Sequence, residues 1–448
     1  MNKKMNRRSF LRSTAAAGAG LVLAPNVIAQ ATGNSKADSL NIALLGAGAQ
    51  GQVLLDSCLR IPGLRFRAVC DIWTAYNQKR VTRLLKKYRH EVNAYVDYAE
   101  MLDKEKDLDA VIIATPDFWH AEHTVACLEA GLHVYCEKEM SNTLEGARRM
   151  LQAARKTGKL LQVGHQRRSN PRYIHCLDKL IKQAKLLGRI TTINAQWNRS
   201  ARPDNGWPKN AAIDQATLNK YGFESMHQFR NWRWYKGLGG GPIVDLGSHQ
   251  IDVFNWFLGA GPKSVIASGG TDYYEKSTHQ WYDTVMAIYE YDYEYDQGKK
   301  QTVRAFYQTI TTNSSNGYYE NFMGDEGTLH ISESAGRGAV YREPSAPDWE
   351  KWVKAGFLNA PTEQKSDSTD AVLDVRETIA PPAYELPIKM ARKYHQPHLE
   401  NFFDAVRGRA KLNCPPEVAY ESAVSVLKVN QAVEAARKLD FKPEEFKV

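Results

Sequence analysis

Hydrophobic positions divide the chain into two parts with different periods. Between residues 38 and 163, short continuous apolar runs alternate with stretches of helical spacing; the runs are LNIALL, FRAVC, AVIIA, LHVYC and LLQV. Continuous apolar runs are typical of strands buried on both faces of a parallel sheet, and helices between them are typical of βαβ units. The pattern therefore predicts a doubly wound α/β domain over residues 38–163.

After residue 164 the segments become longer and alternate polar positions with aromatic or β-branched ones. They are RITTINAQWNRS, KSVIASGGTDYY, DTVMAIYEYDYEY, QTVRAFYQTI and GTLHIS. Such alternation is typical of antiparallel strands with one buried face. It predicts a second, α+β domain over residues 164–448 with a large, mostly antiparallel sheet, as expected for a chain too long for one core. Residues 201–235 are expected to form a long loop near the site, and residues 345–390 an insertion without a clear period.

The first turn of the α/β part reads GAGAQG, a Gly-x-Gly-x-x-Gly pattern at residues 46–51. Gly46 permits the tight turn, Gly48 lets the backbone approach a pyrophosphate, and Gly51 lets the helix pack close to the strand. The next strand ends in Asp71, 20 positions after Gly51. A carboxylate there accepts hydrogen bonds from both ribose hydroxyls and repels a 2′-phosphate, so NAD is predicted and NADP is disfavoured. The alternative is a βαβ turn that binds no ligand.

Polar residues also follow the later strand ends, at residues 115–120 and at Glu137 and Lys138. Because ligands of doubly wound sheets bind outside the carboxyl ends of the strands, these residues are expected on one edge, facing one ligand. The residues predicted to contact the cofactor are Gly46, Gly48, Gln50, Gly51, Asp71, Thr115, Pro116, His120, Glu137 and Lys138. The alternative for Lys138 is a solvated cation at a strand end.

In the second part, GLGGGPIVDLGSHQIDVFNWFLG predicts a helix that begins near Pro242. Asp245, His249 and Asp252 are spaced i, i+4, i+7, which places them on one helix face. A carboxylate beside an imidazole orients the ring and sets its basicity, as proton transfer requires. Two alternatives stay open: a capping aspartate with a core histidine, and a metal site, for which no third ligand is evident. No metal is predicted.

Residues 1–31 have the composition of an export signal. Arg7 and Arg8, followed by Ser-Phe-Leu, match the twin-arginine pattern ahead of a short Ala/Gly-rich apolar stretch. That stretch is too short to span a bilayer, and the pattern is an address read by an export system. We expect the signal to be removed on export and the mature protein to be periplasmic. We expect no membrane insertion after the signal is removed. The alternative is a disordered basic tail.

Composition narrows the classes of partner. The chain has 59 basic and 50 acidic residues, net +9; five basic residues lie in the signal, which leaves 54 against 50, net +4. This charge, spread without long runs, argues against nucleic acid or an anionic membrane as partner. The six cysteines show no C-x-x-C spacing and lie mostly in apolar segments, so buried thiols are expected rather than disulfides.

The motifs together resemble the Gfo/Idh/MocA oxidoreductases, the family of glucose–fructose oxidoreductase and inositol dehydrogenase, in a twin-arginine-exported branch. The resemblance covers essentially the whole chain after the signal. It rests on GAGAQG, the strand-end Asp71, ATPDFWH, the Glu-Lys of CEKEM, GHQRRSNPRY and GGGPIVDLGSHQID. One difference is Glu139, which stands where the family has a proline after Glu-Lys. It is expected to loosen the backbone after Lys138 and to add a carboxylate.

The resemblance implies that Lys138, Asp245 and His249 form the catalytic set. His249 would be the acid/base on the reacting hydroxyl, and Lys138 would hold that oxygen and the nicotinamide ribose. Asp245 would position both groups. The resemblance also implies that Arg168 and Tyr173 lie near the substrate with Asp245 and His249. The open sheet face is expected to form a homodimer or homotetramer.

The expected activity is NAD-dependent oxidation or reduction of a secondary hydroxyl of a sugar or glycoside. Because an exported enzyme would find little free NAD, the cofactor is expected to stay bound and to be recycled in place. Two alternatives remain. One is a redox-neutral, NAD-dependent glycoside hydrolase of the same fold, which the presence of Lys138 disfavours. The other is a non-catalytic protein that senses NAD or a sugar.

Overall fold

The computed structural model describes residues 38–334, 336–361 and 381–448. The predicted export signal at residues 1–31, with Arg7 and Arg8, lies outside the described residues, as does part of the 345–390 insertion. Within the described ranges, no helix combines the length and the apolar character needed to cross a membrane.

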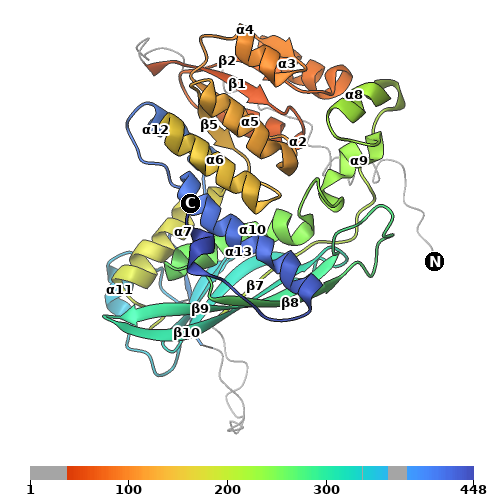
Figure 1. The fold of residues 1–448 in the computed structure, drawn as a ribbon. Coiled ribbons are helices and arrows are strands. Elements are labelled where there is room, and N and C mark those ends of the chain that lie inside the picture. Colours follow the sequence, from red (N-terminus) through yellow and green to blue (C-terminus); the bar gives the residue numbers. More distant parts are fainter. Residues whose placement is uncertain (1–37, 335, 362–380) are drawn as a thin grey trace, which may run out of the picture.

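A six-stranded, all-parallel sheet forms the centre of the first domain (Figure 1). Its strand order, β3-β2-β1-β4-β5-β6, is that of a Rossmann fold. The strands are β1 (Leu40–Leu45), β2 (Leu64–Cys70), β3 (Asn93–Tyr95), β4 (Ala110–Ile113), β5 (His133–Cys136) and β6 (Leu161–Val163). The helices are α2 (Ala49–Cys58), α3 (Lys79–Lys87), α4 (Tyr98–Lys104), α5 (Asp117–Glu129) and α6 (Leu144–Thr157). The predicted doubly wound domain is confirmed.

The chain returns to this sheet near its end. Helix α12 (Gln396–Val406) places Leu399, Phe402 and Phe403 in the same apolar core as strands β1 and β4. The Gln162 side chain of β6 donates to the backbone oxygen of His398 at 2.7 Å. The helix therefore covers part of the first domain although it lies more than 200 residues beyond it in sequence.

A nine-stranded sheet forms the second domain, in the order β14-β13-β12-β11-β7-β10-β9-β8-β15. Only β10 and β7 pair in parallel, so the predicted, mostly antiparallel sheet is confirmed. The strands are β7 (Ile190–Asn198), β8 (Ser264–Gly270), β9 (Thr284–Asp296), β10 (Lys299–Ile310), β11 (Tyr318–Gly324), β12 (Gly327–Ile331), β13 (Gly338–Arg342), β14 (Ala383–Glu385) and β15 (Leu439–Asp440). The sequence pattern missed β11, because its inward position 320 is a glutamate instead of an apolar residue.

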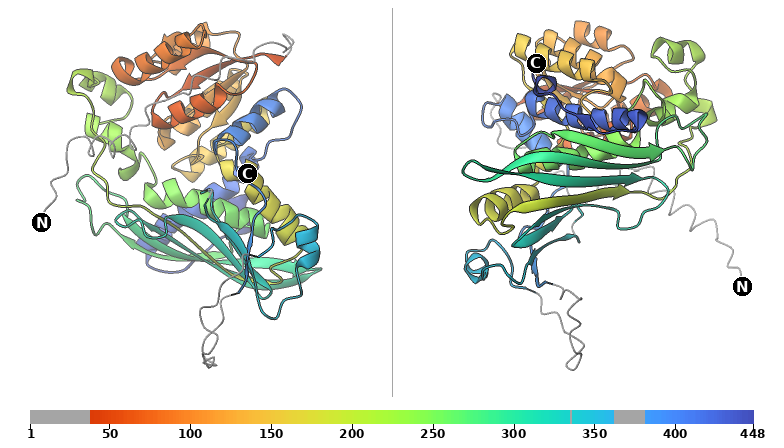
Figure 2. Two further views of the ribbon diagram at one scale, coloured as in Figure 1. Left: turned by 180° about the vertical axis from the view of Figure 1, so that it is seen from behind. Right: turned by 60° about the horizontal axis from the view of Figure 1, so that its bottom comes forward.

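Two long helices cover one face of this sheet, α10 (Gly241–Leu258) and α13 (Pro416–Ala435) (Figure 2). The remaining α-helices of the described residues are short: α7 (Pro171–His175), which continues as a π-helix over Cys176–Gln183, α8 (Gln215–Lys220), α9 (Met226–Asn231) and α11 (Glu350–Lys354). On the other face Ile266, Met286 and Ile288 are 42–45% exposed. All six cysteines are buried and free, as the sequence predicted.

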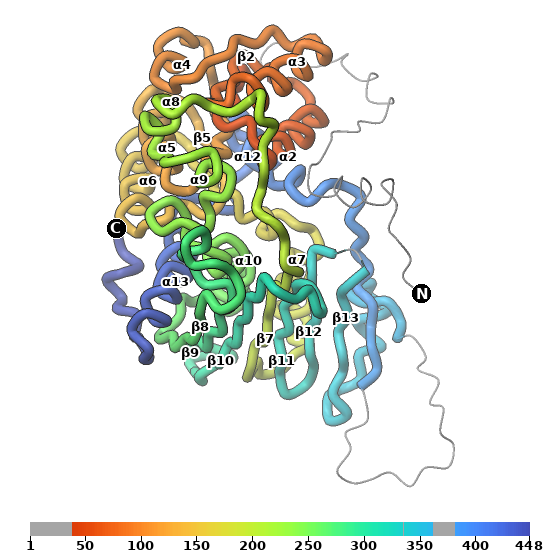
Figure 3. Tube along the Cα trace, turned by 90° about the vertical axis from the view of Figure 1, so that its right-hand side faces the viewer, coloured from red at the N-terminus to blue at the C-terminus, as the bar shows by residue number. Residues whose placement is uncertain are grey.

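Residues 201–235 carry more structure than the expected long loop, since they contain α8 and α9. This bridging segment runs from the second domain onto the first (Figure 3). Its Leu218 and Tyr221 join an aromatic cluster with Trp73 of the first domain. The Trp119 indole donates to the backbone oxygen of Tyr221 at 3.1 Å. The aromatic residues of the segment therefore pack against the Rossmann domain.

Candidate active site

A cavity of about 710 Å³ lies between the carboxyl edge of the parallel sheet, helix α10 and the bridging segment. Most of the predicted site residues line it: Gly46, Gly48, Gln50, Asp71, Thr115, Pro116, Glu137, Lys138, Asp245 and His249. They come from both domains, from the strand ends of the first and from helix α10 of the second. The cavity is therefore where the two domains can act on one ligand.

The glycine turn fits a dinucleotide. Gly46 has a φ of +94°, and a Cβ at Gly51 would clash with the carbonyl oxygen of Gly46, so the turn and the helix need both glycines. A Cβ at Gly48 would meet nothing closer than the Asn77 amide at 3.9 Å, and Gly48 lines the cavity. No side chain caps the start of α2, so its first backbone N–H groups are available to a pyrophosphate.

Asp71 lies beside this turn, as predicted. Its Oδ2 accepts a hydrogen bond from Ala47 N and its Oδ1 accepts one from Trp73 N, both at 2.7 Å. Burial raises the pKa of Asp71 to about 6, although the two backbone hydrogen bonds act in the opposite direction and lower it. Arg230 of the bridging segment lies over the Trp73 ring, 5.0 Å from its centroid, and its charge also lowers the pKa of Asp71.

Lys138 and Asp245 form an ion pair between the domains. Lys138 Nζ lies 3.0 Å from Asp245 Oδ1 and also donates to the Asp245 backbone oxygen. Arg233 Nε contacts the same Oδ1 at 3.2 Å. Burial alone would raise the pKa of Asp245, but Lys138, Arg233 and Arg199 lower it well below its usual range. Asp245 is therefore a permanent anion that orients Lys138 and accepts no proton at neutral pH.

His249 lies one helical turn after Asp245 and is only 7% exposed. Burial, and then the charges of Lys138 and Arg167, lower its pKa well below 6.5. The imidazole is therefore neutral at neutral pH and can accept a proton. Its ring lies 5.5 Å from the Trp197 ring. The third member of the predicted helix face, Asp252, turns instead to Arg168.

His120 lies behind the cavity wall and does not line the cavity, in contrast to its predicted contact with the cofactor. It is 1% exposed, and its ring nitrogens face the backbone oxygens of Glu139 at 2.7 Å and Thr115 at 2.8 Å. The ring thus holds together the loops after β4 and β5. His120 supports the cofactor edge from behind.

Glu139, where the family has proline, is completely buried, and the Lys138–Glu139 peptide is cis. Its Oε1 accepts a hydrogen bond from Met140 N at 2.7 Å. Burial raises the pKa of Glu139 to about 8. The side chain does not line the cavity, so the extra carboxyl lies beside the site and does not face a ligand.

Arg168 and Tyr173 do not reach the cavity, contrary to the role that the resemblance implied. Arg168 Nε is 2.9 Å from Asp252 Oδ1, and both side chains are buried. The Tyr173 hydroxyl donates to Glu320 at 2.7 Å, and Arg167 pairs with the same glutamate. Buried charges require partners, and these pairs hold the loop after β6 between α10 and the large sheet.

Among the polar residues that line the cavity and that the sequence did not single out are Asp117, Arg199, Arg202 and Arg233. Burial raises the pKa of Asp117 to about 7, although Arg233 and Lys138 lower it. Asp117 stands inside ATPDFWH, and Arg199 is the last residue but one of RITTINAQWNRS, so both lie near the ends of predicted strands. Among the described residues, no group of three or more His, Cys, Asp or Glu side chains is arranged to hold a metal ion.

Curated proteins with similar sequences match only part of the chain. A scyllo-inositol 2-dehydrogenase (NADP⁺), IolW, of Bacillus subtilis is 28% identical over 242 residues, 53% of this chain and 56% of the relative. A glycosyl hydrolase family 109 protein of Shewanella baltica is 28% identical over 176 residues, 35% of this chain and 38% of the relative. The chain thus matches about half, or less, of the length of these relatives.

Solved structures match the fold over most of the chain. The WlbA dehydrogenase of Chromobacterium violaceum, in complex with NADH and UDP-GlcNAcA, has a TM-score of 0.65 and 19% identity, covering 91% of this chain and 97% of that one. Levoglucosan dehydrogenase, in complex with NADH and levoglucosan, has a TM-score of 0.65 and 17% identity. The match covers 90% of this chain and 99% of that one.

Family models match both domains. Residues 40–165 match the model described as oxidoreductase family, NAD-binding Rossmann fold, which confirms the predicted class of cofactor. Residues 179–440 match the C-terminal alpha/beta domain of the same oxidoreductase family. Because these two models together match most of the chain, the protein belongs to the Gfo/Idh/MocA family of oxidoreductases.

Proposed function

We propose that the protein is an NAD-dependent oxidoreductase that acts on a secondary hydroxyl of a sugar or glycoside. The observation that carries this proposal is the meeting of Lys138, Asp245 and His249 in the cavity that also contains the glycine turn. The Lys138 ammonium lies near neutral His249 and the dinucleotide cradle. This arrangement suits removal of a hydride from the C–H bond and of a proton from the O–H bond of one substrate alcohol.

Each residue has a separate part in the reaction. Neutral His249 accepts the hydroxyl proton of the substrate, and the Lys138 ammonium stabilises the developing negative charge on that oxygen. Asp245 holds Lys138 in place and balances its charge. Bound NAD would supply the hydride acceptor. The glycine turn and Asp71 would hold the dinucleotide so that the nicotinamide lies near Lys138.

We further propose that the cofactor stays bound through successive turnovers, so that each oxidation is followed by a reduction in the same site. The support is the bridging segment, which packs on the first domain over the cavity through Trp73, Leu218 and Tyr221. A retained cofactor suits the periplasmic location proposed from residues 1–31. The exposed face with Ile266, Met286 and Ile288 supports a homodimer or homotetramer.

A redox-neutral glycoside hydrolase is the second candidate. The partial match to a glycosyl hydrolase family 109 protein favours it. A redox-neutral hydrolysis would also require that the cofactor stays bound and is recycled. The two candidates differ in products. A dehydrogenase converts a hydroxyl to a carbonyl, whereas the hydrolase releases the aglycone of a glycoside without net change of the nicotinamide.

The test is to incubate the purified protein with candidate sugars and aryl glycosides, and to follow nicotinamide absorbance and aglycone release together. Reduced nicotinamide that appears with a sugar, without aglycone release, supports the dehydrogenase. Aglycone release at constant absorbance favours the hydrolase. If no sugar or glycoside gives either signal, and none binds in calorimetry, the proposed function is wrong.

A further inference from the structure

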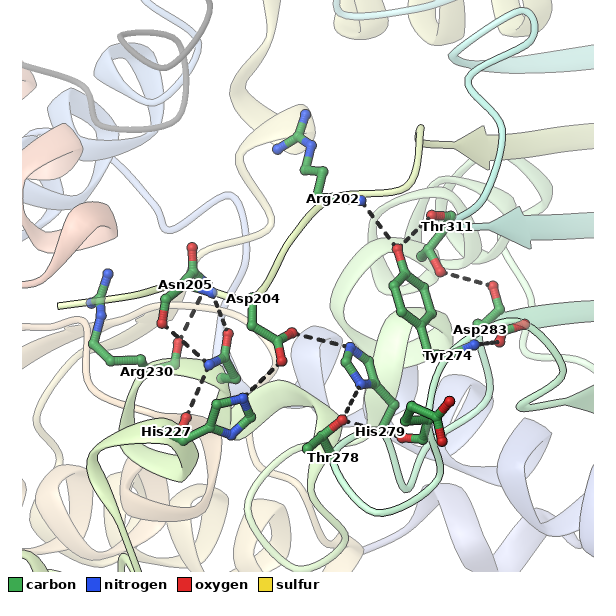
Figure 4. A network of polar contacts seen from close by, with 12 residues as sticks. Arg202, Asp204, Asn205, His227, Arg230, Tyr274, Thr278, His279, Asp283 and Thr311 are labelled. Carbon is green, nitrogen blue, oxygen red and sulfur yellow. Dashed lines mark hydrogen bonds and ion pairs between the residues drawn. The ribbon is translucent and has the colours of Figure 1, made fainter. Parts of the chain in front are cut away.

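Two arginines on the substrate side of the cavity face it without a carboxylate partner. Arg199 and Arg202 follow the end of β7, and both line the cavity. Within the described residues, the structure assigns neither guanidinium an ion pair or a hydrogen bond. The Arg199 guanidinium lies 5.1 Å from the centroid of the Trp197 ring, and Arg202 uses only its backbone N–H, which donates to the Tyr274 hydroxyl at 3.2 Å. Figure 4 shows the Arg202 guanidinium directed away from Tyr274 and from the other residues drawn.

The neighbouring carboxylates already have partners. Asp204 accepts from His227 at 2.7 Å and lies 3.4 Å from His279 (Figure 4). Glu333 pairs with Arg167 at 3.2 Å. Neither carboxylate therefore forms an ion pair with Arg199 or Arg202.

Four cations line the catalytic end of the cavity: Lys138, Arg199, Arg202 and Arg233. The carboxylates beside them are Asp117, Glu137 and Asp245, and Glu137 accepts a hydrogen bond from the Gln50 amide at 3.1 Å. Asp245 is shared by Lys138 and Arg233. Burial lowers the pKa of Arg199, and the charges of Arg202 and Arg233 lower it further, although Asp245 raises it. Arg199 is partly buried and Arg202 is exposed. Neighbouring guanidinium groups without a carboxylate partner are stabilised by a bound anion.

Aromatic rings form the walls beside these cations. Tyr318 stacks on Trp197 at 4.6 Å between ring centroids, and Tyr274 stacks on His279 at 4.4 Å. All but His279 line the cavity. Flat, apolar rings next to guanidinium groups suit a compact ring that has an apolar face and an anionic substituent.

We infer that the substrate is an acidic sugar, whose carboxylate is bound by Arg199 and Arg202 while its secondary hydroxyl faces His249. This inference rests on the proposed function and deepens it by naming the substrate class. A sulfate ester on a sugar has the same oxyanion chemistry. The cofactor pyrophosphate is a different source of negative charge, but its cradle is at Gly48 and the start of α2. Arg230, at the Asp71 end, is the arginine that faces the cofactor.

The experiment compares three matched substrates: methyl glucoside, methyl glucuronoside and a methyl glucoside sulfate. We expect kcat/KM for one of the two anionic sugars to exceed that of the neutral sugar by at least about tenfold, the order of one charged contact. Arg199→Gln and Arg202→Gln should each reduce this ratio by about fivefold or more, and Arg199→Lys should retain part of it. Arg83→Gln, an exposed arginine of α3, is the control and should leave the ratio unchanged.

Calorimetry with the anionic sugars and with NAD gives a readout that does not depend on turnover. The arginine variants should bind the anionic sugar more weakly and bind NAD within about twofold of the parent protein. Equal kcat/KM for the neutral and anionic sugars, or a loss of NAD affinity in Arg202→Gln, would overturn the inference. If no sugar is turned over but arginine-dependent binding of an anionic sugar persists, the proposed activity is wrong and the acidic-sugar site stands.

Discussion

Lys138 Nζ and Asp245 Oδ1 lie 3.0 Å apart and join the end of strand β5 in the first domain to helix α10 in the second. Both side chains are mostly buried, at 11% and 21% exposure. The ion pair fixes the ammonium at the border between the dinucleotide cradle and the pocket that contains His249. The border between the domains is thus the place where cofactor and substrate chemistry meet.

Loss of Lys138 should remove stabilisation of the reacting oxygen. Lys138→Ala is expected to lower the hydride-transfer rate by about 10²-fold or more, roughly 3 kcal/mol of barrier, while NAD still binds. Single-turnover kinetics and NAD titration check this. Lys236→Ala removes a surface lysine paired with Glu434 at 2.9 Å and should leave the rate unchanged. A Lys138→Ala protein of normal rate would mean that Lys138 is only a solvated cation.

The pH profile should report His249. Its pKa is lowered by burial and by the neighbouring cations, so the base form should persist below pH 6.5 and be lost only at more acidic pH. We expect kcat/KM to stay level through pH 6.5 and to fall on the acid side. His249→Gln should be slower by about 10²-fold and should lack this acid limb. A fall centred at the ordinary histidine pKa would contradict the lowered value.

Asp71 should select NAD over NADP by at least about tenfold at pH 8, measured by binding titration. Burial raises its pKa to about 6, so the preference should shrink below that pH as the carboxyl becomes neutral. Because Arg230 already lies over Trp73 beside Asp71, Asp71→Ser alone should improve NADP binding. Adding Arg230→Gln to that variant should remove the gain. Equal affinities of the parent protein at pH 8 would refute the role of Asp71.

Glu139 should make stability depend on pH. Its pKa is raised by burial from 4.5 to about 8, so the folded state holds a proton there that the unfolded state releases above 4.5. The stability present below pH 4.5 is lost as pH rises towards 8, by up to about 1.4 kcal/mol per pH unit. In Glu139→Gln this contribution should be missing, so stability should fall less steeply, while buried Asp71 and Asp117 keep theirs. Denaturant unfolding of both proteins between pH 5 and 8 measures it, and parallel curves would show that Glu139 is ionised when folded.

The bridging segment should slow the release of NAD. Leu218 is 2% exposed and does not line the cavity, so Leu218→Ala weakens the packing of the segment without touching a ligand. We expect NAD dissociation to be about tenfold faster in this variant, and less nicotinamide to be recovered from the denatured protein. Leu329→Ala, at a buried position of β12, controls for general destabilisation. A parent protein that purifies without nicotinamide and depends strictly on added NAD would exclude retention.

The sequence by itself determined the two domain types and most of the cofactor edge. Apolar runs specify buried parallel strands, and the turn itself requires two of the glycines, since Gly46 has a φ of +94° and a Cβ at Gly51 would clash with the carbonyl oxygen of Gly46. The positions of Asp71 and Lys138 could be predicted because each follows a strand end, and the carboxyl ends of strands in one parallel sheet share an edge. The i, i+4 spacing of Asp245 and His249 likewise needed only the helix.

Only the tertiary structure decided which polar residues face the ligand. Arg168 and Tyr173 are also polar, but they are bound by the buried partners Asp252 and Glu320, which lie far away in the sequence, and they do not line the cavity. Arg199 and Arg202 line it, and among the described residues no carboxylate forms an ion pair with either of them. Such pairings depend on residues far apart in sequence, whose distances are set by the packing of two sheets and are absent from any local pattern.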